Sequence, residues 1–504
     1  MKQHGVGTRE RRYSVSEGTA ERKDNEVRRD ECGKSEHLNS TCEAGEQTPK
    51  DPVEGRKVSG YGIVGGKGTN MSGFDNVSTK QRRIAELAKD APDMAMDLSH
   101  HMDMEWFMEA YRRTRKNGAL GIDEQSAQEY AENLEENLRS LLERAKSGQY
   151  IAPAVKRVYI PKDAAGKELR PIGIPTFEDK VLQRAVVMAL EPVYEQDFLA
   201  CSYGFRPRLS AHMAIAAVRS SLGEMGGGYI IDLDIRKYFD TIDHRQIQNI
   251  FRKRVRDGVL VRLIGKWLNA GVMEDDLITY LETGVPQGGV ISPILSNIYL
   301  HEVLDGWFEE VVKPCLRGKA SMVRFADDAV LMFERQDDAE RVMDVLPKRF
   351  AKYGLTLHPE KTRLVSFKKP VDKVDGDGET ESFNFLGFTH FWAKSRDGYW
   401  VIKRKTAKDR LARALKRLSL WLRKVRHEPI AKQHRELCAK VRGHTQYYGI
   451  RGNSDALNSL VYWTQRLWKK WLGRRSRKAK KNWQWFNGML ERFPLPRPVI
   501  RHLC

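Results

Sequence analysis

The spacing of apolar residues predicts a helical region that begins near residue 78. Amphipathic helices are expected over 81–89 and 104–115, and a longer one over 125–146, because apolar side chains recur there with a helical period. Residues 1–77 lack this pattern and are rich in Gly, Ser, Glu, Lys and Arg. We therefore expect a disordered leader over 1–77 and a helical N-terminal extension over 78–150.

From residue 151 the pattern changes to short β-rich runs separated by Gly and Pro. Strands are expected over 155–161, 228–235 and 383–392, and a strand, a turn and a strand over 321–333. A helix is expected over 177–194, and further helices fill the gaps. The middle of the chain is therefore predicted to belong to the α+β class.

The C-terminal part is predicted to be helical and strongly basic. Helices are expected over 406–426 and 431–448, with an apolar and a basic face. Between 401 and 481 the chain has 25 Lys or Arg and four Asp or Glu, whereas the formal net charge of all 504 residues is +20. The excess charge therefore lies in this segment. It indicates a polyanionic partner, although a merely soluble basic protein would have the same composition.

Cysteine usage and hydropathy restrict the compartment. The six cysteines are scattered and form no C-x-x-C pair, which disfavours a disulfide framework and a zinc ribbon. No run of about 18 apolar residues is present, and the N-terminus lacks the apolar core of a signal peptide. We expect a cytosolic protein with reduced thiols and no membrane partner.

The candidate chemistry lies in two acidic segments. Asp232 and Asp234 are two apart in an apolar strand, so both would point to one face. Asp327 and Asp328 lie between two apolar runs, where burying carboxylates is costly unless a cation neutralises them. Mg²⁺ takes one or two carboxylates and leaves its other positions to water and phosphates. Asp234, Asp327 and Asp328 could therefore hold two Mg²⁺ ions, although a single Asp is more often structural.

Eight motifs occur in an order that is typical of one family. They are Tyr159-Ile-Pro-Lys162, Arg170-Pro-Ile-Gly-Ile-Pro175, Cys201-Ser-Tyr-Gly-Phe-Arg-Pro207, Asp234-Ile-Arg-Lys-Tyr-Phe-Asp-Thr-Ile-Asp-His244, Gly284-Val-Pro-Gln-Gly-Gly-Val-Ile-Ser-Pro293, Phe325-Ala-Asp-Asp328, Gly354-Leu-Thr-Leu-His-Pro-Glu-Lys-Thr362 and Phe385-Leu-Gly-Phe388. Together they resemble the reverse transcriptase/maturases encoded by bacterial group II introns. The resemblance covers about residue 80 to the C-terminus. It departs from the family at Phe325, where Tyr is commoner.

The resemblance implies a right-hand polymerase of the α+β class. Fingers and a palm with an antiparallel sheet are expected over 151–395. A helical thumb, or maturase domain, is expected over 396–460, and a basic nucleic-acid-binding region over 461–504. The helical N-terminal extension would precede the fingers.

The metal-site roles of the family can be placed on this sequence. Asp234, Asp327 and Asp328 would hold two Mg²⁺ ions, for which Mn²⁺ could substitute, and the carbonyl of Ile235 would complete one metal shell. Lys361 would give a proton to the departing pyrophosphate.

Four further positions would touch the incoming nucleotide. Lys162 and Arg170 would hold its triphosphate. Phe239 would leave no room for a 2′-hydroxyl and so select deoxynucleotides, although it could equally be a core residue. Gln287 would contact the nucleotide or the template.

The basic C-terminal region interleaves cations with tryptophans, among them Trp468, Trp471, Trp483 and Trp485. Such tryptophans either stack on unpaired bases or close a small core, and both interpretations stay open for each of them. The residues expected to contact nucleic acid are Arg466, Lys469, Lys470, Arg474, Arg475, Arg477 and Lys478.

The resemblance implies RNA-directed DNA synthesis from deoxynucleoside triphosphates on an RNA template with a DNA primer. It also implies binding of structured intron RNA, to assist splicing and mobility at a DNA target in the bacterial cytoplasm. Two alternatives remain: the same fold recruited to phage defence or another host role, or a splicing cofactor that needs no polymerisation. The sequence contains no cluster of paired cysteines and His-Asn-His residues like the family's endonuclease module, so we expect priming without second-strand cutting. The oligomeric state is not indicated.

Overall fold

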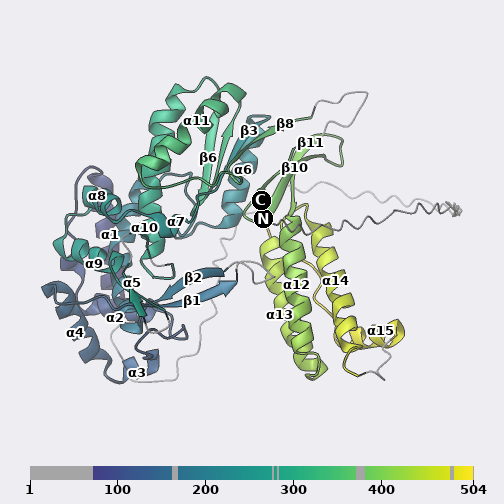
Figure 1. Cartoon of the computed structure of the whole chain (residues 1–504), viewed down its shortest axis with the longest axis horizontal. Coiled ribbons are helices and arrows are strands. Elements are labelled where there is room, and N and C mark those ends of the chain that lie inside the picture. The colour runs from purple at the N-terminus through teal and green to yellow at the C-terminus, as the bar shows by residue number, and fades with distance from the viewer. Residues whose placement is uncertain are drawn as a thin grey trace, which may run out of the picture. The chain divides into compact units, whose positions relative to one another are not determined.

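The computed structural model describes residues 72–161, 169–274, 277–280, 283–285, 287–370, 381–476 and 482–502 (Figure 1). All of them belong to one unit, Thr69–Cys504. Most of the predicted leader lies outside the described residues. Helix α1, Ser72–Asp90, begins before residue 78, so the helical region starts earlier than the apolar periodicity predicts.

Four helices form the N-terminal region: α1, α2 (Met104–Arg113), α3 (Ala127–Glu132) and α4 (Leu134–Ser147). The single helix predicted over 125–146 is wrong, because the chain breaks at Asn133, with φ −121° and ψ 46°. The side chain of Asn137 donates to the carbonyl of Tyr130 at 2.9 Å, which partly replaces the helical bonds lost at the break. The apolar period continues across the break, so the pattern alone could not reveal it.

The first sheet has the strand order β2-β1-β4-β5. The predicted strand over 155–161 is confirmed as β1, and it pairs antiparallel with β2 and parallel with β4. The strands are β1 (Val155–Pro161), β2 (Leu169–Ile174), β4 (Val272–Glu274) and β5 (Leu277–Thr279). Helix α5, Phe177–Asp197, confirms the helix predicted over 177–194 and packs against α1 and α2 in the main core.

The second sheet is antiparallel throughout, with the strand order β6-β7-β3-β8. Its strands are β3 (Gly227–Leu233), β6 (Ala320–Phe325), β7 (Asp328–Phe333) and β8 (Arg363–Lys368). The side chains alternate between two cores, as period-two sequences require. One face packs on helix α11, Gln336–Lys352, and the other on helix α6, Ala211–Glu224 (Figure 1). The hairpin predicted over 321–333 is confirmed as β6 and β7.

Short helices connect these sheets and complete the main core. They are α7 (Tyr238–Thr241), α8 (His244–Arg254), α9 (Gly258–Leu268) and α10 (Ser292–Leu300), and α10 continues into two π-helical segments, His301–Asp305 and Trp307–Val312.

A third sheet has the strand order β11-β10-β9. The strand structure predicted over 383–392 is confirmed and contains a tight hairpin, in whose turn Leu386 and Gly387 both have positive φ, at 49° and 82°. Gly387 is the usual residue type for such a turn, whereas a Leu is uncommon at a positive φ. The strands are β9 (Phe383–Phe385), β10 (Phe388–Lys394) and β11 (Trp400–Thr406).

The C-terminal region is helical, with α12, α13 and α14 running side by side in Figure 1. The helices predicted over 406–426 and 431–448 are confirmed as α12 (Lys408–Lys424) and α13 (Ile430–Tyr448). Two more helices follow, α14 (Ser454–Leu472) and α15 (Trp483–Arg492). All four contribute to a separate apolar core, which includes Leu422, Trp468 and Phe486. The mixed α/β structure with a helical C-terminal region agrees with the predicted class.

Candidate active site

Asp232 in strand β3 and Asp234 directly after it point to the same side, as predicted. Tyr229, Ile231 and Leu233 belong to one core, whereas Asp232 and Asp234 line a cavity of about 410 Å³ on the opposite side. The carboxyl of Asp232 is half-buried, and burial raises its pKa to about 6. The apolar strand therefore holds these carboxylates at the C-terminal end of a strand that is paired on both sides.

The β6–β7 hairpin brings a second pair of acids to this place. Ala326 and Asp327 form its turn, where Ala326 has a φ of 57°, and Asp328 pairs with Phe325. Asp328 lines the same cavity as Asp234, whereas Asp327 stands in the adjoining turn. Asp328 remains open to solvent on one side. Even so, burial and the nearby charge of Asp327, followed by those of Asp234 and Asp232, raise its pKa to about 7.

Burial also raises the pKa of Asp327, and the charge of Asp234 makes a smaller contribution in the same direction. The guanidinium of Arg170 acts in the opposite direction on this carboxyl. Like charges that shift one another's pKa upward would be relieved by a bound cation. Asp232, Asp234, Asp327 and Asp328 therefore form an acidic cluster, and neighbouring basic groups do not fully neutralise its negative charge.

The backbone of Asp234 is held on both sides. The amide of His358 donates to the Asp234 carbonyl at 2.8 Å, and the hydroxyl of Thr362 donates to the same carbonyl at 3.2 Å. The Asp234 amide donates back to that hydroxyl at 3.3 Å. Ile235, the next residue, is buried and forms an isolated bridge with Leu357. Thr362 is thus a positioning residue that the sequence did not single out.

Lys361 lies beside the acids. Its ammonium group donates to Asp234 Oδ2 at 3.5 Å, and its side chain is 60% exposed. Lys361 also lines the 410 Å³ cavity. The structure therefore brings together Asp234, Asp328 and Lys361 around one space.

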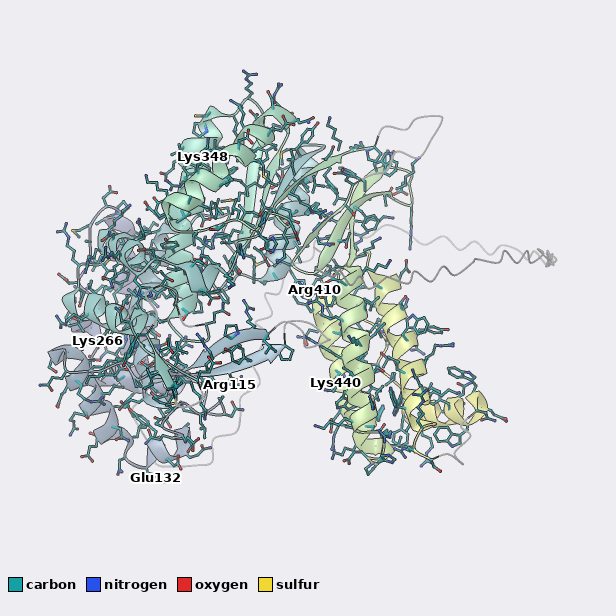
Figure 2. The ribbon with its side chains drawn as sticks, viewed as in Figure 1. Arg115, Glu132, Lys266, Lys348, Arg410 and Lys440 are labelled. Carbon is teal, nitrogen blue, oxygen red and sulfur yellow. The ribbon has the colours of Figure 1, made fainter. Side chains whose placement is uncertain are left out.

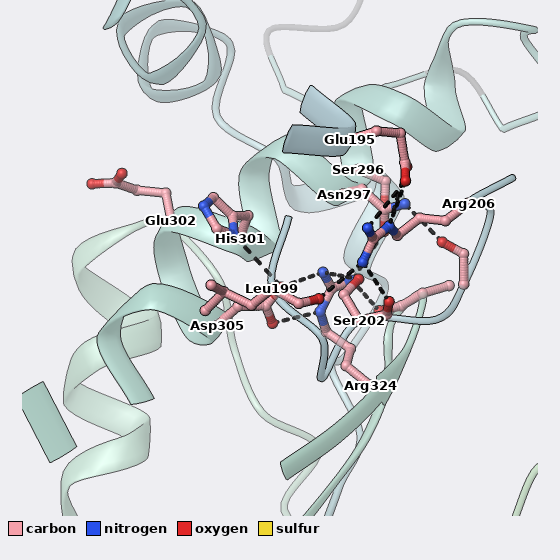
Figure 3. A network of polar contacts seen from close by, with 12 residues as sticks. Glu195, Leu199, Ser202, Arg206, Ser296, Asn297, His301, Glu302, Asp305 and Arg324 are labelled. Atoms are coloured by element: carbon pink, nitrogen blue, oxygen red, sulfur yellow. Dashed lines mark hydrogen bonds and ion pairs between the residues drawn. The ribbon is translucent and has the colours of Figure 1, made fainter. Parts of the chain in front are cut away.

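A buried arginine supports the turn from below (Figure 3). Arg324 is fully buried and forms a double ion pair with Asp305, at 2.7 and 2.5 Å. It also donates to Asn297 Oδ1 at 3.0 Å, to Ser202 Oγ at 2.7 Å and to the carbonyl of Ala326 at 3.1 Å. The last of these bonds fixes the residue that precedes Asp327. A lone Arg in an apolar strand was the sequence signal for this network, because such a charge needs a buried acid.

The segment that contains Ser202 also packs directly under the turn. The amide of Tyr203 donates to the Arg324 carbonyl at 2.8 Å, and Asn297 donates to the carbonyl of Gly204 at 2.7 Å. A Cβ on Gly204 would stand 2.2 Å from the amide nitrogen of Ala326. The Cys201–Pro207 motif is therefore a support for the β6–β7 turn, which only glycine can approach so closely.

The expected nucleotide-binding residues lie beside the first sheet. Arg170 Nε donates to Gln287 Oε1 at 3.0 Å, and the amide of Gly173 donates to the Gln287 carbonyl at 2.6 Å. Phe239 is 9% exposed and lines a small cavity of about 30 Å³ with Gln287. Lys162 lies outside the described residues. The structure thus brings Arg170, Gln287 and Phe239 to one neighbourhood.

The C-terminal helices contribute to the acidic cavity as well. Arg410, labelled near the start of α12 in Figure 2, lines it together with the Leu386–Gly387 turn. Its charge also lowers the pKa of Asp328, although burial and the neighbouring acids outweigh it. The cavity is therefore lined by acids and by the basic groups of Arg410, Lys361 and Arg363, the last of which lies 3.7 Å from Asp232 Oδ2.

The carboxylates of the acidic cluster supply only part of the coordination shell of a hard divalent cation. Within the described ranges 72–161, 169–274, 277–280, 283–285, 287–370, 381–476 and 482–502, no three His, Cys, Asp or Glu side chains form a ready-made metal shell. Mg²⁺ is usually held by one or two carboxylates together with substrate phosphates rather than by an all-protein cage. Burial raises the pKa values of both Asp327 and Asp328, which agrees with a site that is completed by ion and substrate.

The basic residues predicted to contact nucleic acid divide into several groups. Arg466, Lys470 and Arg474 are exposed on α14 or just after it, and Lys469 is half-buried. Arg475 instead donates to the carbonyls of Arg426 and Glu428, which ties the end of α14 to the α12–α13 connection. Arg477 and Lys478 lie outside the described residues.

The tryptophans divide in the same way. Trp468 is fully buried, and Trp471 donates to Ser419 Oγ at 3.1 Å, so both belong to the helical core. Trp485 packs partly against that core, whereas Trp483 is 46% exposed. Of these four, Trp483 is the one that presents a large part of its ring to solvent.

Comparison with known proteins agrees with the site. Residues 160–390, from the end of β1 into β10, match the family model described as reverse transcriptase (RNA-dependent DNA polymerase). This segment holds all four aspartates, Lys361 and the Arg324 network. It is a reverse transcriptase domain, and the predicted enzyme class, an RNA-directed DNA polymerase, is confirmed for it.

Individual relatives match parts of the chain. Protein YkfC of Escherichia coli (strain K12) is 39% identical over 234 residues, which cover 45% of this chain and 61% of that protein. The group II intron-encoded protein LtrA of Lactococcus lactis subsp. cremoris is 40% identical over 169 residues, 34% of this chain and 28% of its own.

An uncharacterized 91 kDa protein in the cob intron of Schizosaccharomyces pombe is 24% identical over 469 residues, 80% of this chain and 57% of its own. The chain therefore spans less than two thirds of the length of these three relatives. In the described part of the chain, no helix is both long and apolar enough to cross a membrane.

Proposed function

We propose that this protein copies RNA into DNA, extending a DNA primer with deoxynucleoside triphosphates. The observation that carries the proposal is the convergence of Asp234 and Asp328 on one cavity, with Asp327 in the adjoining turn, inside a reverse transcriptase domain. In this reaction the primer 3′-oxygen forms a bond to the α-phosphorus, the bond to the β-phosphate breaks, and pyrophosphate leaves.

The acidic cluster would hold two divalent ions, Mg²⁺ or in its place Mn²⁺. Asp234, Asp327 and Asp328 would be the ligands, with the Ile235 carbonyl completing one shell. Such ions activate the attacking hydroxyl and stabilise the leaving oxygen. Lys361, which already reaches the Asp234 carboxylate at 3.5 Å, would move to the pyrophosphate and supply its proton.

The nucleotide would lie between the first sheet and the acids. Arg170 and Lys162 would bind the triphosphate, since guanidinium groups suit bidentate phosphate contacts. Gln287 is preorganised for a contact with nucleotide or template by its bond to Arg170. Phe239, beside it in the small cavity, would close the space that a ribonucleotide 2′-hydroxyl needs.

The described sheets and helices are compatible with a right-hand polymerase. The first sheet would form the fingers and the antiparallel sheet the palm, and residues 396–460, with helices α12 and α13, would form the thumb. The N-terminal helices over 78–150 would extend the fingers, and residues 461–504 would form the basic nucleic-acid-binding region.

A primer-extension assay tests the polymerase. Wild-type protein should extend a DNA primer on an RNA template in the presence of Mg²⁺, and Asp327→Ala should reduce the rate at least ~10³-fold, because a metal ligand is lost. Asp344→Ala, an exposed acid on α11, is the matched control and should keep the wild-type rate. Polymerisation that survives Asp327→Ala would overturn the proposed site.

We further propose that the protein binds group II intron RNA to assist its splicing and mobility in the bacterial cytoplasm. The basic helices α12–α14 and the similarity to an intron-encoded protein support this role. Splicing of the flanking intron RNA at low Mg²⁺ is the test, with wild-type and Asp327→Ala proteins. Rescue by both would separate RNA binding from catalysis, whereas rescue by neither would favour phage defence or another host role.

A further inference from the structure

Three large aromatic side chains gather on the surface of α14 and at the start of α15. Tyr462, Trp463 and Trp483 are 51%, 48% and 46% exposed. Tyr462 and Trp463 meet edge to face, with ring centroids 5.4 Å apart. Folding gains little from leaving such rings in water, so a group of them marks a surface that binds something.

Cations are interleaved with these rings. The guanidinium carbon of Arg466 lies 5.4 Å from the Tyr462 ring, 5.6 Å from Trp463 and 5.6 Å from Trp483. The ammonium of Lys469 lies 4.6 Å from the Trp483 ring. We call these five residues, Tyr462, Trp463, Arg466, Lys469 and Trp483, the aromatic–basic patch.

Contacts with neighbouring side chains hold the rings and cations of the patch in place. The Trp483 ring packs edge to face on Phe486, with centroids 5.8 Å apart, and Phe486 is fully buried against Trp468. Arg466 also donates to the Tyr462 hydroxyl at 2.9 Å. Rings and cations are therefore held in position before any ligand arrives, which lowers the entropic cost of binding.

The surrounding charge indicates what the ligand is. From 461 to 504 the chain has 12 Lys or Arg and one acid, Glu491. Protein–protein interfaces are depleted in lysine at their centre, whereas surfaces for single-stranded nucleic acid combine cations for phosphates with rings for bases. A base pair inside a duplex hides both faces of its bases, so the exposed rings favour unpaired nucleotides.

We propose that the aromatic–basic patch binds single-stranded nucleic acid, with unpaired bases stacked on Trp463 and Trp483 and phosphates held by Arg466 and Lys469. This inference rests on the proposed role of the C-terminal region in nucleic-acid binding and adds the strandedness of the ligand and the residues that read it. RNA and DNA share the recognised chemistry, so both are tested.

The experiment must locate the contact, because the full chain also has a polymerase site for nucleic acid. Oligonucleotides of about 12 nucleotides, in RNA and DNA versions, carry one 5-iodouracil and are photocrosslinked to the full-length protein. Peptide mapping then identifies the crosslinked ring. We expect crosslinks at Trp463 or Trp483 with the single strands and a loss of them when the same strand is annealed into a blunt duplex.

Affinity measurements with variants give the energetic test. Trp463→Ala and Trp483→Ala should each weaken single-strand binding on the order of tenfold, since one stacked base contributes about that much. Neither should change the affinity for an abasic strand of equal length, which has phosphates but no bases. Arg466→Ala should weaken both. Trp483→Phe keeps a ring and should retain most of the affinity, and Tyr399→Ala, which removes a 73% exposed ring elsewhere, should have no effect.

Crosslinks confined to residues outside the patch, or equal losses with the intact and abasic strands, would overturn the inference. Unchanged binding by both tryptophan variants would do the same and would point to a protein partner. Primer extension by the same variants separates this result from the proposed function: wild-type protein that fails to polymerise contradicts the polymerase proposal, whatever the patch binds.

Discussion

The acidic cluster and the aromatic–basic patch are built in opposite ways. The acidic cluster lies at one end of the two central strands β3 and β7, where the backbone of Asp234 is clamped by Thr362 and the β6–β7 turn is supported by buried Arg324. The patch lies on a helix surface, where exposed side chains arrange one another through ring and cation contacts. A site where bonds are made needs its side chains in fixed positions. A site that binds a flexible single strand needs side chains that can adjust to it. Single changes should therefore have large, cooperative effects at the acidic cluster and small, graded ones at the patch.

The largest expected effect comes from Arg324→Met. It leaves the carboxylate of Asp305 buried without its partner, so we expect a loss of about 3–5 kcal/mol in the free energy of unfolding. Urea unfolding measures it. Arg335→Ala, which removes an exposed ion pair with Asp337, should change the free energy of unfolding far less. The double variant Arg324→Met/Asp305→Leu should recover part of the loss, and no recovery would argue against the pair as its cause.

A smaller effect is expected from Thr362→Val, which keeps the side-chain shape and removes both bonds to the Asp234 backbone. Stability should fall by about 1 kcal/mol. Because the ligand backbone is no longer fixed, kcat should fall on the order of tenfold, with KM for the nucleotide nearly unchanged. Steady-state primer extension measures both, and Thr362→Ser, which keeps the hydroxyl, should restore the rate. A change in KM alone would contradict a positioning role.

The acidic cluster should also make stability depend on pH when metal is absent. The pKa of Asp328 is raised to about 7 in the folded protein, above about 3.9 in the unfolded chain. The folded state therefore binds the proton more tightly, and the stability that this supplies is lost as pH rises from about 4 to about 7. Asp328→Asn should raise the melting temperature above that of the wild type at about pH 8 in chelator, with little difference near pH 4.

Divalent metal sharpens this prediction. Mg²⁺ should raise the wild-type melting temperature at about pH 8 and should raise that of Asp328→Asn less, because a ligand is missing. Asp344→Asn serves as the control and should follow the wild type. A difference between Asp328→Asn and wild type that is flat with pH would contradict the raised pKa.

The smallest effect is expected at the patch, from Lys469→Ala. Loss of one phosphate contact should weaken single-strand binding a few-fold and lower the slope of log K against log salt by about 0.7. Titration at several salt concentrations measures the slope. Lys348→Ala, an exposed lysine on α11 labelled in Figure 2, should leave it unchanged. A steep cooperative loss would show that the patch is built like the acidic cluster after all.

Much of the fold could be predicted where the pattern and the local structure agree. Strand β3 and the β6–β7 hairpin follow from short apolar runs, and α12 and α13 follow from a helical period. Two breaks were not predicted, because the apolar pattern continues across them. Asn133 interrupts a continuous apolar period, and Leu386 adopts a positive φ although it has a Cβ. Such conformations are stabilised by contacts from distant segments, which a local pattern does not contain.

The sequence by itself determined the acids, the order of the motifs and the concentration of positive charge after residue 400, because these depend on residue types along the chain. Only the tertiary structure decided how those residues are used. It joined Ser202, Asn297, Asp305 and Arg324 beneath one turn, although they are more than 100 residues apart at the extremes. It also buried Trp468 and exposed Trp483. Arg475 donates to the carbonyl of Arg426, in the connection between α12 and α13. The physical reason is that burial and buried pairing depend on which segments fold against one another.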